Sequence, residues 1–373
     1  MNKHIYADNA ATTLLSRRAF DAMTPYLLTD YGNASQPYSF ARSPKKALKE
    51  ARAIIADCIG ALPEEIYFTS CGTESDNWVI LGAIHQNMPI ITTPIEHHAI
   101  LHPCMYAANI GHPVKYLPVD NTGMVHIKDL DSNLTETNHL VSIMFANNEI
   151  GTIEPIQELV SIAHNKGAFF HTDAVQAVGH IPIHVKSLGI DMLSASAHKF
   201  NGPKGVGFLY IKKGIQWPSL LMGGTQERGC RAGTENIASI IGMAIALKEN
   251  IDALSQNQQH LVHLERALLQ KLISANIDFQ RNGADYHIPG NMNLSFKGKS
   301  GETLLHRLDL YGISVSTGSA CDSQNTQISH VLKAINLKTE YAKGTIRISL
   351  SKDNTEEDIF KIADALEKII KPT

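Results

Sequence analysis

The sequence predicts an α/β protein with a largely parallel sheet, joined to a second and smaller α+β unit. Short apolar strands alternate with amphipathic helices through most of the chain, a pattern typical of parallel sheets whose strands are connected by helices. A stretch near 235–275 contains no proline and is expected to be one long helix leading to the second unit. The 373 residues exceed the length of one typical compact domain, which favours two associated domains.

The first well-marked helix is expected to begin at Ser43 and Pro44, because serine followed by proline is typical of an N-cap and a first helical turn. Apolar residues then recur at helical spacing, and Gly60 is expected to end the helix. Strands are predicted at 66–68, 90–93, 140–145, 168–171, 192–195 and 206–211. Helices are predicted between some of them, at about 76–86 and at 156–165.

The pattern changes after the long helix. Strands are expected at 292–296 and 345–350, and helices near 302–311 and 355–370. Thr355, followed three residues later by Asp358, predicts a capping box at the start of the last helix. We therefore predict a large domain over residues 14–260 and a small domain formed by residues 1–13 and 261–373.

The composition excludes several classes of protein. Hydrophobic residues make up 43% and charged residues 18%, as in soluble globular proteins. The net charge of −3 and the lack of a basic block argue against direct binding of nucleic acid. No apolar run reaches the ~18 residues of a membrane span, and the N-terminus lacks the apolar core of a secretory signal. Five cysteines without a CxxC pair indicate free thiols rather than disulfides or a metal site, so we expect a cytoplasmic protein.

Lys199 is the first candidate for a chemical role. It follows the predicted strand at 192–195 directly and is surrounded by serine, histidine and glycine. A lysine whose ammonium group is partly desolvated becomes less basic, which suits it to Schiff-base chemistry. The alternative is a surface lysine in a glycine-rich turn, and this is the simpler interpretation of the segment taken alone.

Asp173 follows a hydrophobic strand, where a buried carboxylate is costly unless it has a partner. The protonated ring nitrogen of a pyridine cofactor would be such a partner. An aspartate beside that nitrogen keeps it protonated, so that the ring can take up electrons from a substrate. Gln176 could donate to the phenolate oxygen of the same cofactor. The alternative is that Asp173 caps the segment that follows it.

Three more strand ends carry polar residues. The turn at 69–75 joins a strand to a helix, so its backbone amides can bind an anion, and Gly72 permits close approach. His97 follows the strand at 90–93 and could stack on an aromatic cofactor or transfer protons, although a buried structural histidine is the alternative. Asn148 follows the strand at 140–145, and strand ends are where open α/β sheets bind ligands.

Taken together, these clusters resemble those of fold-type I pyridoxal-phosphate enzymes, in their class V aminotransferase branch. Over essentially its whole length the chain is similar to the cysteine desulfurase family, the NifS/IscS-like group. The matching segments lie at 6–13, 68–77, 146–151, 171–176, 196–199, 223–234 and 316–321. The resemblance implies a large cofactor domain with a mostly parallel sheet and a small α+β domain.

The resemblance also implies roles for particular residues. Lys199 would bind pyridoxal 5′-phosphate covalently, Asp173 would contact the ring nitrogen, and His97 would stack on the ring. Asn148 and Gln176 would lie near the oxygen substituent of the ring.

The remaining implied residues bind phosphate or substrate. Thr234 would complete the phosphate site of the neighbouring subunit, which implies a homodimer with active sites at its interface. Arg347 would hold the substrate carboxylate, and Asn33 would lie near the substrate. The phosphate would be held within one subunit by Gly72, Thr73, Ser196 and His198.

Cys321 is the candidate sulfur nucleophile. The segment at 315–326 consists mainly of small and polar residues, so we expect an exposed, mobile loop in the small domain. A thiolate on such a loop could attack a substrate and carry a persulfide away. Of the other cysteines, Cys58 lies on an apolar helix face and Cys71 beside the phosphate turn. Cys104 has no activating neighbour, whereas Cys230 stands between two arginines and is the second candidate.

The implied reaction removes sulfur from L-cysteine to give L-alanine and a Cys321 persulfide. The persulfide would pass to an acceptor protein, for iron–sulfur cluster assembly or tRNA thiolation. A selenocysteine lyase or another class V aminotransferase is the alternative, and a non-enzymatic partner protein with this fold is a third. The polar segment after Cys321 resembles the long-loop group of the family. The chain departs from the family at Gln36-Pro37-Tyr38, in the substrate pocket, and we expect it to lack the C-terminal tail with which some members bind their scaffold.

Overall fold

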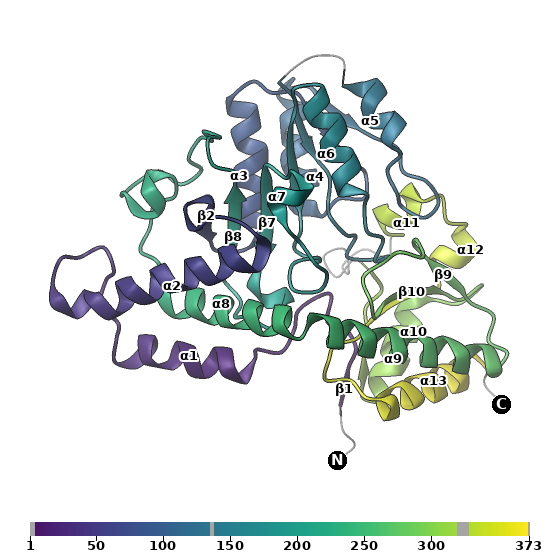
Figure 1. Ribbon diagram of the computed structural model, residues 1–373. Helices are drawn as coiled ribbons and strands as arrows, with labels where there is room; N and C mark the ends of the chain where they lie inside the picture. Colours follow the sequence, from purple (N-terminus) through teal and green to yellow (C-terminus); the bar gives the residue numbers. More distant parts are fainter. Residues whose placement is uncertain (1–3, 135–137, 319–327, 372–373) are drawn as a thin grey trace.

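A seven-stranded sheet forms the centre of the computed structural model, which describes residues 4–134, 138–318 and 328–371 (Figure 1). The strand order is β2-β8-β7-β6-β5-β3-β4. Strand β8 is antiparallel to both β2 and β7, and the other pairs are parallel. The predicted α/β class with a mostly parallel sheet is therefore confirmed. The strands are β2 (Ile66–Thr69), β3 (Ile90–Thr92), β4 (Val114–Tyr116), β5 (Leu140–Ser142), β6 (Phe169–Asp173), β7 (Met192–Ser196) and β8 (Gly207–Ile211).

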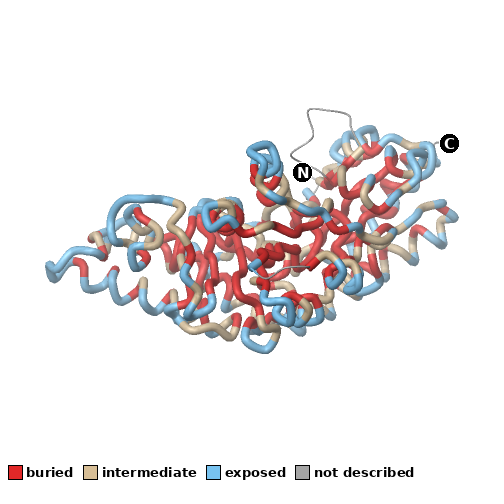
Figure 2. The backbone as a smooth tube through the Cα atoms, turned by 90° about the horizontal axis from the view of Figure 1, so that it is seen from above, coloured by how far each residue is buried: buried red, intermediate tan, exposed pale blue. Residues whose placement is uncertain are grey.

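Helices cover both faces of this sheet, and its inner strands are buried along almost their whole length (Figure 2). One face packs against α3 (Gly72–His85) and α4 (His98–Asn109), with Trp78 as the largest buried side chain. The other face packs against α1 (Arg17–Leu28), α2 (Arg42–Ile59), α6 (Ile156–Asn165) and α8 (Ile237–Asp252). Two short helices, α5 (Ile127–Asn133) and α7 (Val185–Leu188), complete this part of the chain.

A second core is built around a three-stranded antiparallel sheet. Strand β10 (Asn291–Ser295) lies between β9 (Gln280–Asn282) and β12 (Thr345–Ser349). Helices α9 (Leu254–Ser274), α10 (Gly301–Leu310) and α13 (Glu356–Ile370) pack on it. The N-terminal strand β1 (Ile5–Tyr6) pairs with β11 (Ile313–Ser314), so the start of the chain lies beside this smaller unit. The division of the chain near residue 260 stays a prediction.

Several predicted helices match the structure closely. Helix α2 ends at Gly60 as predicted, and the φ of 70° at Gly60 is the left-handed conformation that glycine adopts without strain. Its predicted N-cap was wrong, because the helix begins at Arg42 after Ala41 and the hydroxyl of Ser43 donates to Asp30. Helix α6 has the predicted bounds, and the capping box of α13 is present at Thr355 and Asp358. Two short helices, α11 (His330–Ala334) and α12 (Thr339–Ala342), were not predicted.

Two other predictions about helices were wrong. The long helix is broken at Ala253, whose ψ of 9° is not helical. The break separates α8, which packs on α1 and α2, from α9, which packs on α13. The direction of each helix is therefore set by the hydrophobic core against which it packs. The helix predicted at 76–86 begins at Gly72, because Cys71 is the last extended residue. The expected phosphate turn is therefore the first turn of α3 itself.

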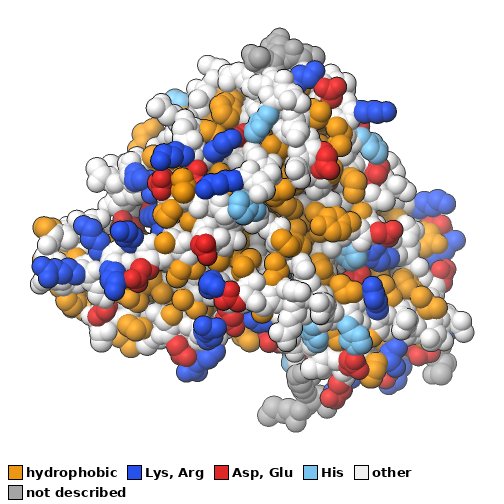
Figure 3. All heavy atoms as spheres, in the orientation of Figure 1, with side chains coloured by type: hydrophobic (Ala, Val, Ile, Leu, Met, Phe, Trp, Pro, Cys, Tyr) orange, Lys and Arg blue, Asp and Glu red, His pale blue; other side chains and the backbone are white. Residues whose placement is uncertain are grey.

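Among the residues in the described ranges, no helix has both the length and the apolarity to cross a bilayer. Positive and negative side chains are interspersed on the face seen in Figure 3, consistent with the net charge of −3.

Candidate active site

A cavity of about 280 Å³ lies where β5, β6 and β7 end, between the large sheet and the smaller unit. Strands β2, β3, β5, β6 and β7 point the same way, so the residues that follow them meet at one edge of the sheet. The structure brings together the predicted residues Gly72, Thr73, His97, Asn148, Asp173, Gln176, Ser196, His198, Lys199 and Arg347, all of which line this cavity.

Lys199 reaches the cavity from a short 3₁₀ turn, Ala197–Lys199, directly after β7. Its Nζ donates to the backbone oxygen of Ala10 at 2.6 Å and to that of Ala11 at 2.9 Å. These two carbonyls belong to the segment after β1, so the N-terminal part of the chain holds the amine in place. Nearby, the Gln176 side chain donates to the same oxygen of Ala10 at 3.0 Å.

Asp173 ends β6 and is 5% exposed. Burial raises its pKa to about 6, although a hydrogen bond from the amide of Val175 and the charge of Lys199 oppose this rise. The amide of Val175 donates to Oδ1 at 2.9 Å. Asp173 therefore caps the local turn and also lines the cavity, so the two interpretations of this residue are compatible.

The start of α3 and the end of β7 form a site for an anion. Gly72 and Thr73 are the first two residues of α3, where backbone amides have no partner within the helix. A Cβ atom on Gly72 would lie 2.6 Å from Cγ2 of Val175, so this position requires glycine. The hydroxyl of Ser196 is buried and has no hydrogen-bond partner among the described residues.

These features fit pyridoxal phosphate. The helix terminus and the Ser196 hydroxyl would hold its phosphate, Asp173 would pair with its ring nitrogen, and Lys199 would bind its aldehyde carbon. His198, whose Nδ1 lies 3.1 Å from the hydroxyl of Thr12, completes the wall beside Lys199.

His97 is the N-cap of α4, and its Nδ1 accepts a hydrogen bond from the amide of Ala99 at 3.1 Å. Burial, followed by the charge of Lys199, lowers the pKa of His97 to about 4. The ring is therefore neutral near pH 7. Because Nδ1 accepts, the proton of the neutral ring lies on Nε2, which can donate to a group in the cavity.

The low pKa of His97 predicts how folding stability depends on pH. Between its ordinary value of 6.5 and about 4, the unfolded chain binds a proton that the folded chain does not. His97 thus lowers the free energy of unfolding as the pH falls, by about 3 kcal/mol at pH 4. We expect His97→Gln to flatten the decline of Tm between pH 6.5 and 4.

The matched control for this prediction is His306→Gln, because His306 is exposed on α10. Its Tm should follow the wild-type dependence on pH. Identical slopes for wild type and His97→Gln would show that His97 is protonated as easily in the folded chain as in the unfolded one.

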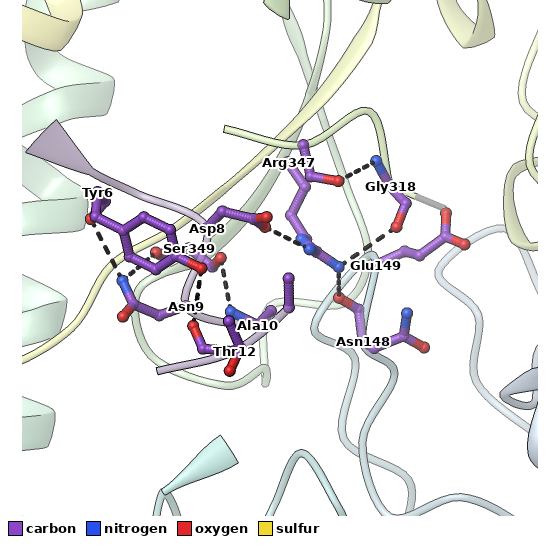
Figure 4. A network of polar contacts seen from close by, with 12 residues as sticks. Tyr6, Asp8, Asn9, Ala10, Thr12, Asn148, Glu149, Gly318, Arg347 and Ser349 are labelled. Carbon is purple, nitrogen blue, oxygen red and sulfur yellow. Dashed lines mark hydrogen bonds and ion pairs between the residues drawn. The ribbon is translucent and has the colours of Figure 1, made fainter. Parts of the chain in front are cut away.

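Arg347 enters the cavity from β12 and is 2% exposed (Figure 4). Its Nη2 forms an ion pair with Oδ1 of Asp8 at 2.6 Å. Its Nη1 donates to the backbone oxygen of Asn148 at 2.9 Å and, less closely, to that of Gly318 at 3.4 Å. Nε is buried and has no hydrogen-bond partner in the described ranges, which leaves a donor for a carboxylate in the cavity.

Three predicted residues are not placed at this cavity. Asn33 does not line it. Thr234 is exposed and lines a separate cavity of about 160 Å³, which also includes Arg231 and Phe68. Cys321 lies outside the described residues. Gly318, three positions before it, lines the main cavity.

The other cysteines differ in their surroundings. Burial raises the pKa of Cys58 and that of Cys104 to about 12, so both thiols are poor nucleophiles near pH 7. Cys71 lines the main cavity, and Cys230 is half-buried, with its sulfur 3.9 Å from the backbone oxygen of Arg228.

The carboxyl groups of Asp8, Asp76 and Glu149 at the site were missed. Asp8 lies in the segment at 6–13, which resembles the cysteine desulfurase family. No local sequence pattern indicated that Asp8 would form an ion pair with Arg347. Asp76 also lines the cavity. It stands four residues after Gly72, one helical turn on, so a correct start for α3 would have placed both on one face.

Comparisons with known proteins agree with this arrangement. The family model of aminotransferase class V matches residues 5–362. The chain is 46% identical to a cysteine desulfurase IscS of Clostridium botulinum, over 100% of this chain and 95% of that protein. It is 47% identical to a cysteine desulfurase IscS of Dictyoglomus turgidum, with the same shares of each chain covered.

Solved structures show the same fold. A NifS-like protein superposes with a TM-score of 0.92 at 37% identity, covering 98% of this chain and 99% of that chain. A structure of SspA in complex with cysteine superposes with a TM-score of 0.83 at 32% identity, covering 94% of this chain and 100% of that chain.

Proposed function

Because the chain belongs to the class V aminotransferases and, among them, to the cysteine desulfurase family, we propose that its cavity removes sulfur from L-cysteine. The enzyme is a pyridoxal-phosphate-dependent cysteine desulfurase. The observation that carries this conclusion is the convergence of Lys199, Asp173 and Arg347, from three distant segments, on one cavity.

Each of these residues has a task in the reaction. Bound pyridoxal phosphate supplies a ring that takes up the electron pair released at the substrate Cα. Lys199 holds the cofactor and afterwards removes the Cα proton. Asp173 keeps a negative charge at the ring nitrogen. Arg347 binds the substrate carboxylate through its fork of N–H groups, and His97 offers a proton at Nε2.

Cys321 performs the sulfur chemistry. Its thiolate attacks the sulfur of the substrate, so a sulfur–sulfur bond forms and the bond between Cβ and sulfur breaks. The electron pair of the broken bond stays with the carbon, which takes up a proton and becomes the methyl group of L-alanine. A persulfide remains on Cys321 and passes to an acceptor protein, either an iron–sulfur scaffold or a tRNA-thiolation enzyme.

The working form is a homodimer in the cytoplasm. Thr234 is exposed and lies away from the cavity of its own subunit, which supports a role at the phosphate of the neighbouring subunit. Asn33, which is half-buried and also absent from its own cavity, contributes near the substrate.

The direct test is an assay of the purified protein with L-cysteine and a thiol reductant. Sulfide and L-alanine should form in equal amounts. Transfer of the amino group to a keto acid without sulfide release would instead identify an aminotransferase.

Asp173→Asn should keep the cofactor and lose at least roughly 100-fold in turnover, because a neutral amide no longer supports the charge on the ring nitrogen. Cofactor content and alanine formation measure the two effects separately. Asp21→Asn, an exposed substitution on α1, is the control and should behave as wild type. Near-normal turnover in Asp173→Asn would remove this carboxylate from the mechanism.

A further inference from the structure

Among the described residues, three buried carboxyl groups line the active-site cavity, those of Asp76, Glu149 and Asp173, and the reaction described above uses only that of Asp173. Oε2 of Glu149 accepts a hydrogen bond from the hydroxyl of Ser329 at 2.6 Å, whereas Asp76 has a different environment. Asp173 lies at the end of β6. Asp76 lies in the second turn of α3, is 1% exposed, and lines the same cavity. Its Oδ1 is buried without a hydrogen-bond partner among the described residues. A buried carboxylate in this condition is costly, so the protonation state of Asp76 needs a physical explanation.

The neighbouring histidine does not supply a positive charge to Asp76. The Nε2 atom of His171 lies 3.8 Å from Oδ1 of Asp76, too far for a hydrogen bond. The two ring nitrogens of His171 instead contact the hydroxyls of Ser142, at 2.9 Å, and Ser194, at 3.0 Å. Complete burial lowers the pKa of His171 to about 3, so the ring is neutral.

The backbone places both carboxyl groups in one polar pocket. Ser194 on β7 is the register partner of Asp173 on β6, and its hydroxyl also bonds to Asp76. His171 stands two residues before Asp173, so both side chains lie on one face of β6.

The groups that act on Asp76 are acidic or neutral. Asp173 and His171 belong to β6, and Glu96 belongs to the segment after β3. Cys71 is the residue before α3. Within the described parts of the chain, no lysine or arginine forms an ion pair with Asp76. Lys199 acts on Asp173 instead, as does the amide of Val175.

These surroundings divide the charge unequally. Burial and the neighbouring Asp173 raise the pKa of Asp76 well above its ordinary value. Burial also raises the pKa of Asp173, but the amide of Val175 and the charge of Lys199 limit the raised pKa to about 6. Two buried carboxyl groups that line one cavity and repel each other do not both ionise readily, and the contacts favour the charge on Asp173.

We propose that Asp76 is a positioning residue that remains a neutral carboxylic acid, so that the pair carries one negative charge and Asp173 holds it. The inference rests on the proposed function, in which that charge faces the ring nitrogen of the cofactor. An ionised Asp76 would compete for the single charge and leave Asp173 protonated for part of the time. Neutral Asp76 thus keeps the charge at the one carboxylate that meets the ring.

Infrared difference spectroscopy of the holoenzyme near pH 7 tests the protonation state directly, without turnover. Wild type minus Asp76→Asn should contain the carbonyl stretch of a protonated carboxylic acid. Wild type minus Asp173→Asn should contain the bands of an ionised carboxylate instead. Glu154→Gln is the positive control, because burial raises the pKa of Glu154 to about 8 and this residue does not line the cavity.

Carboxylate bands in the Asp76→Asn difference spectrum would overturn the proposal, as would a protonated band in the Asp173→Asn spectrum. If Asp76→Asn does not fold, Asp76→Ser gives the same test with a smaller neutral side chain.

A pH titration of the visible absorption of the bound cofactor provides a second readout. Wild type should show a step where Asp76 ionises, above the ordinary range of a carboxyl group, and Asp76→Asn should lack that step. A step that persists in Asp76→Asn would contradict the inference. Failure to form alanine would overturn the proposed function but would leave both spectroscopic results to decide the state of Asp76.

Discussion

Lys199→Ala is expected to lose the covalent bond to pyridoxal phosphate and at least about 10³-fold in turnover. In the proposed mechanism the same amine holds the cofactor and removes the Cα proton, so one substitution is expected to remove both the attachment and the base. No neighbouring lysine can replace it, because the carbonyls of Ala10 and Ala11 position only Lys199 at the cavity among the described residues.

Borohydride reduction followed by peptide mass spectrometry measures the bond. Wild type should carry the reduced cofactor on the peptide that contains Lys199, and Lys199→Ala should carry none. Lys204→Ala is the matched control, because Lys204 is an exposed lysine in the same glycine-rich turn. A reduced adduct on a different lysine in Lys199→Ala would show that the assignment is wrong.

Cys321→Ser should separate the proton chemistry from the sulfur chemistry. In the proposed mechanism Lys199 needs nothing from the thiol to remove the Cα proton, so the variant should still exchange this proton with deuterated solvent. It should form almost no alanine, since a serine hydroxyl is a far poorer nucleophile toward sulfur than a thiolate. Deuterium in recovered L-cysteine and the yield of alanine measure the two halves.

Cys230→Ser is the matched control for this split. It should exchange the proton and form alanine at wild-type rates. Alkylation mapping adds a test of reactivity, in which Cys321 should react before Cys58 and Cys104, whose pKa values burial raises to about 12. Alanine formation at the wild-type rate by Cys321→Ser would exclude the persulfide on this residue, and fast alkylation of Cys230 would point there instead.

Residues that follow a strand directly could be predicted from the sequence. Lys199 and Asp173 stand next to apolar runs with strand-like composition, and the parallel sheet then brings the strand ends to one edge. Their interpretation depended on several clusters together, because each cluster alone had a structural alternative. The roles of Thr234, Asn33 and Cys321 stay predictions.

Contacts between distant segments could not be predicted. Asp8 and Arg347 are 339 positions apart, and only the packing of the N-terminal segment beside β12 brings them together. The break at Ala253 was missed for a related reason. The sequence there continues with good helix formers, and the change of direction follows from two separate cores that local propensity does not describe.

The segment after β1 has a consequence for the order in which the protein can mature on the ribosome. It supplies the carbonyls that hold Lys199 and the carboxylate that holds Arg347, yet it is itself secured by late residues. Strand β1 pairs with β11, and the amide of Ala10 donates to the hydroxyl of Ser349. The segment after β1 must therefore wait for β11 and β12, more than 300 residues later in the chain, before the active site exists. A nascent chain that already contains the whole seven-stranded sheet is still without a finished catalytic centre.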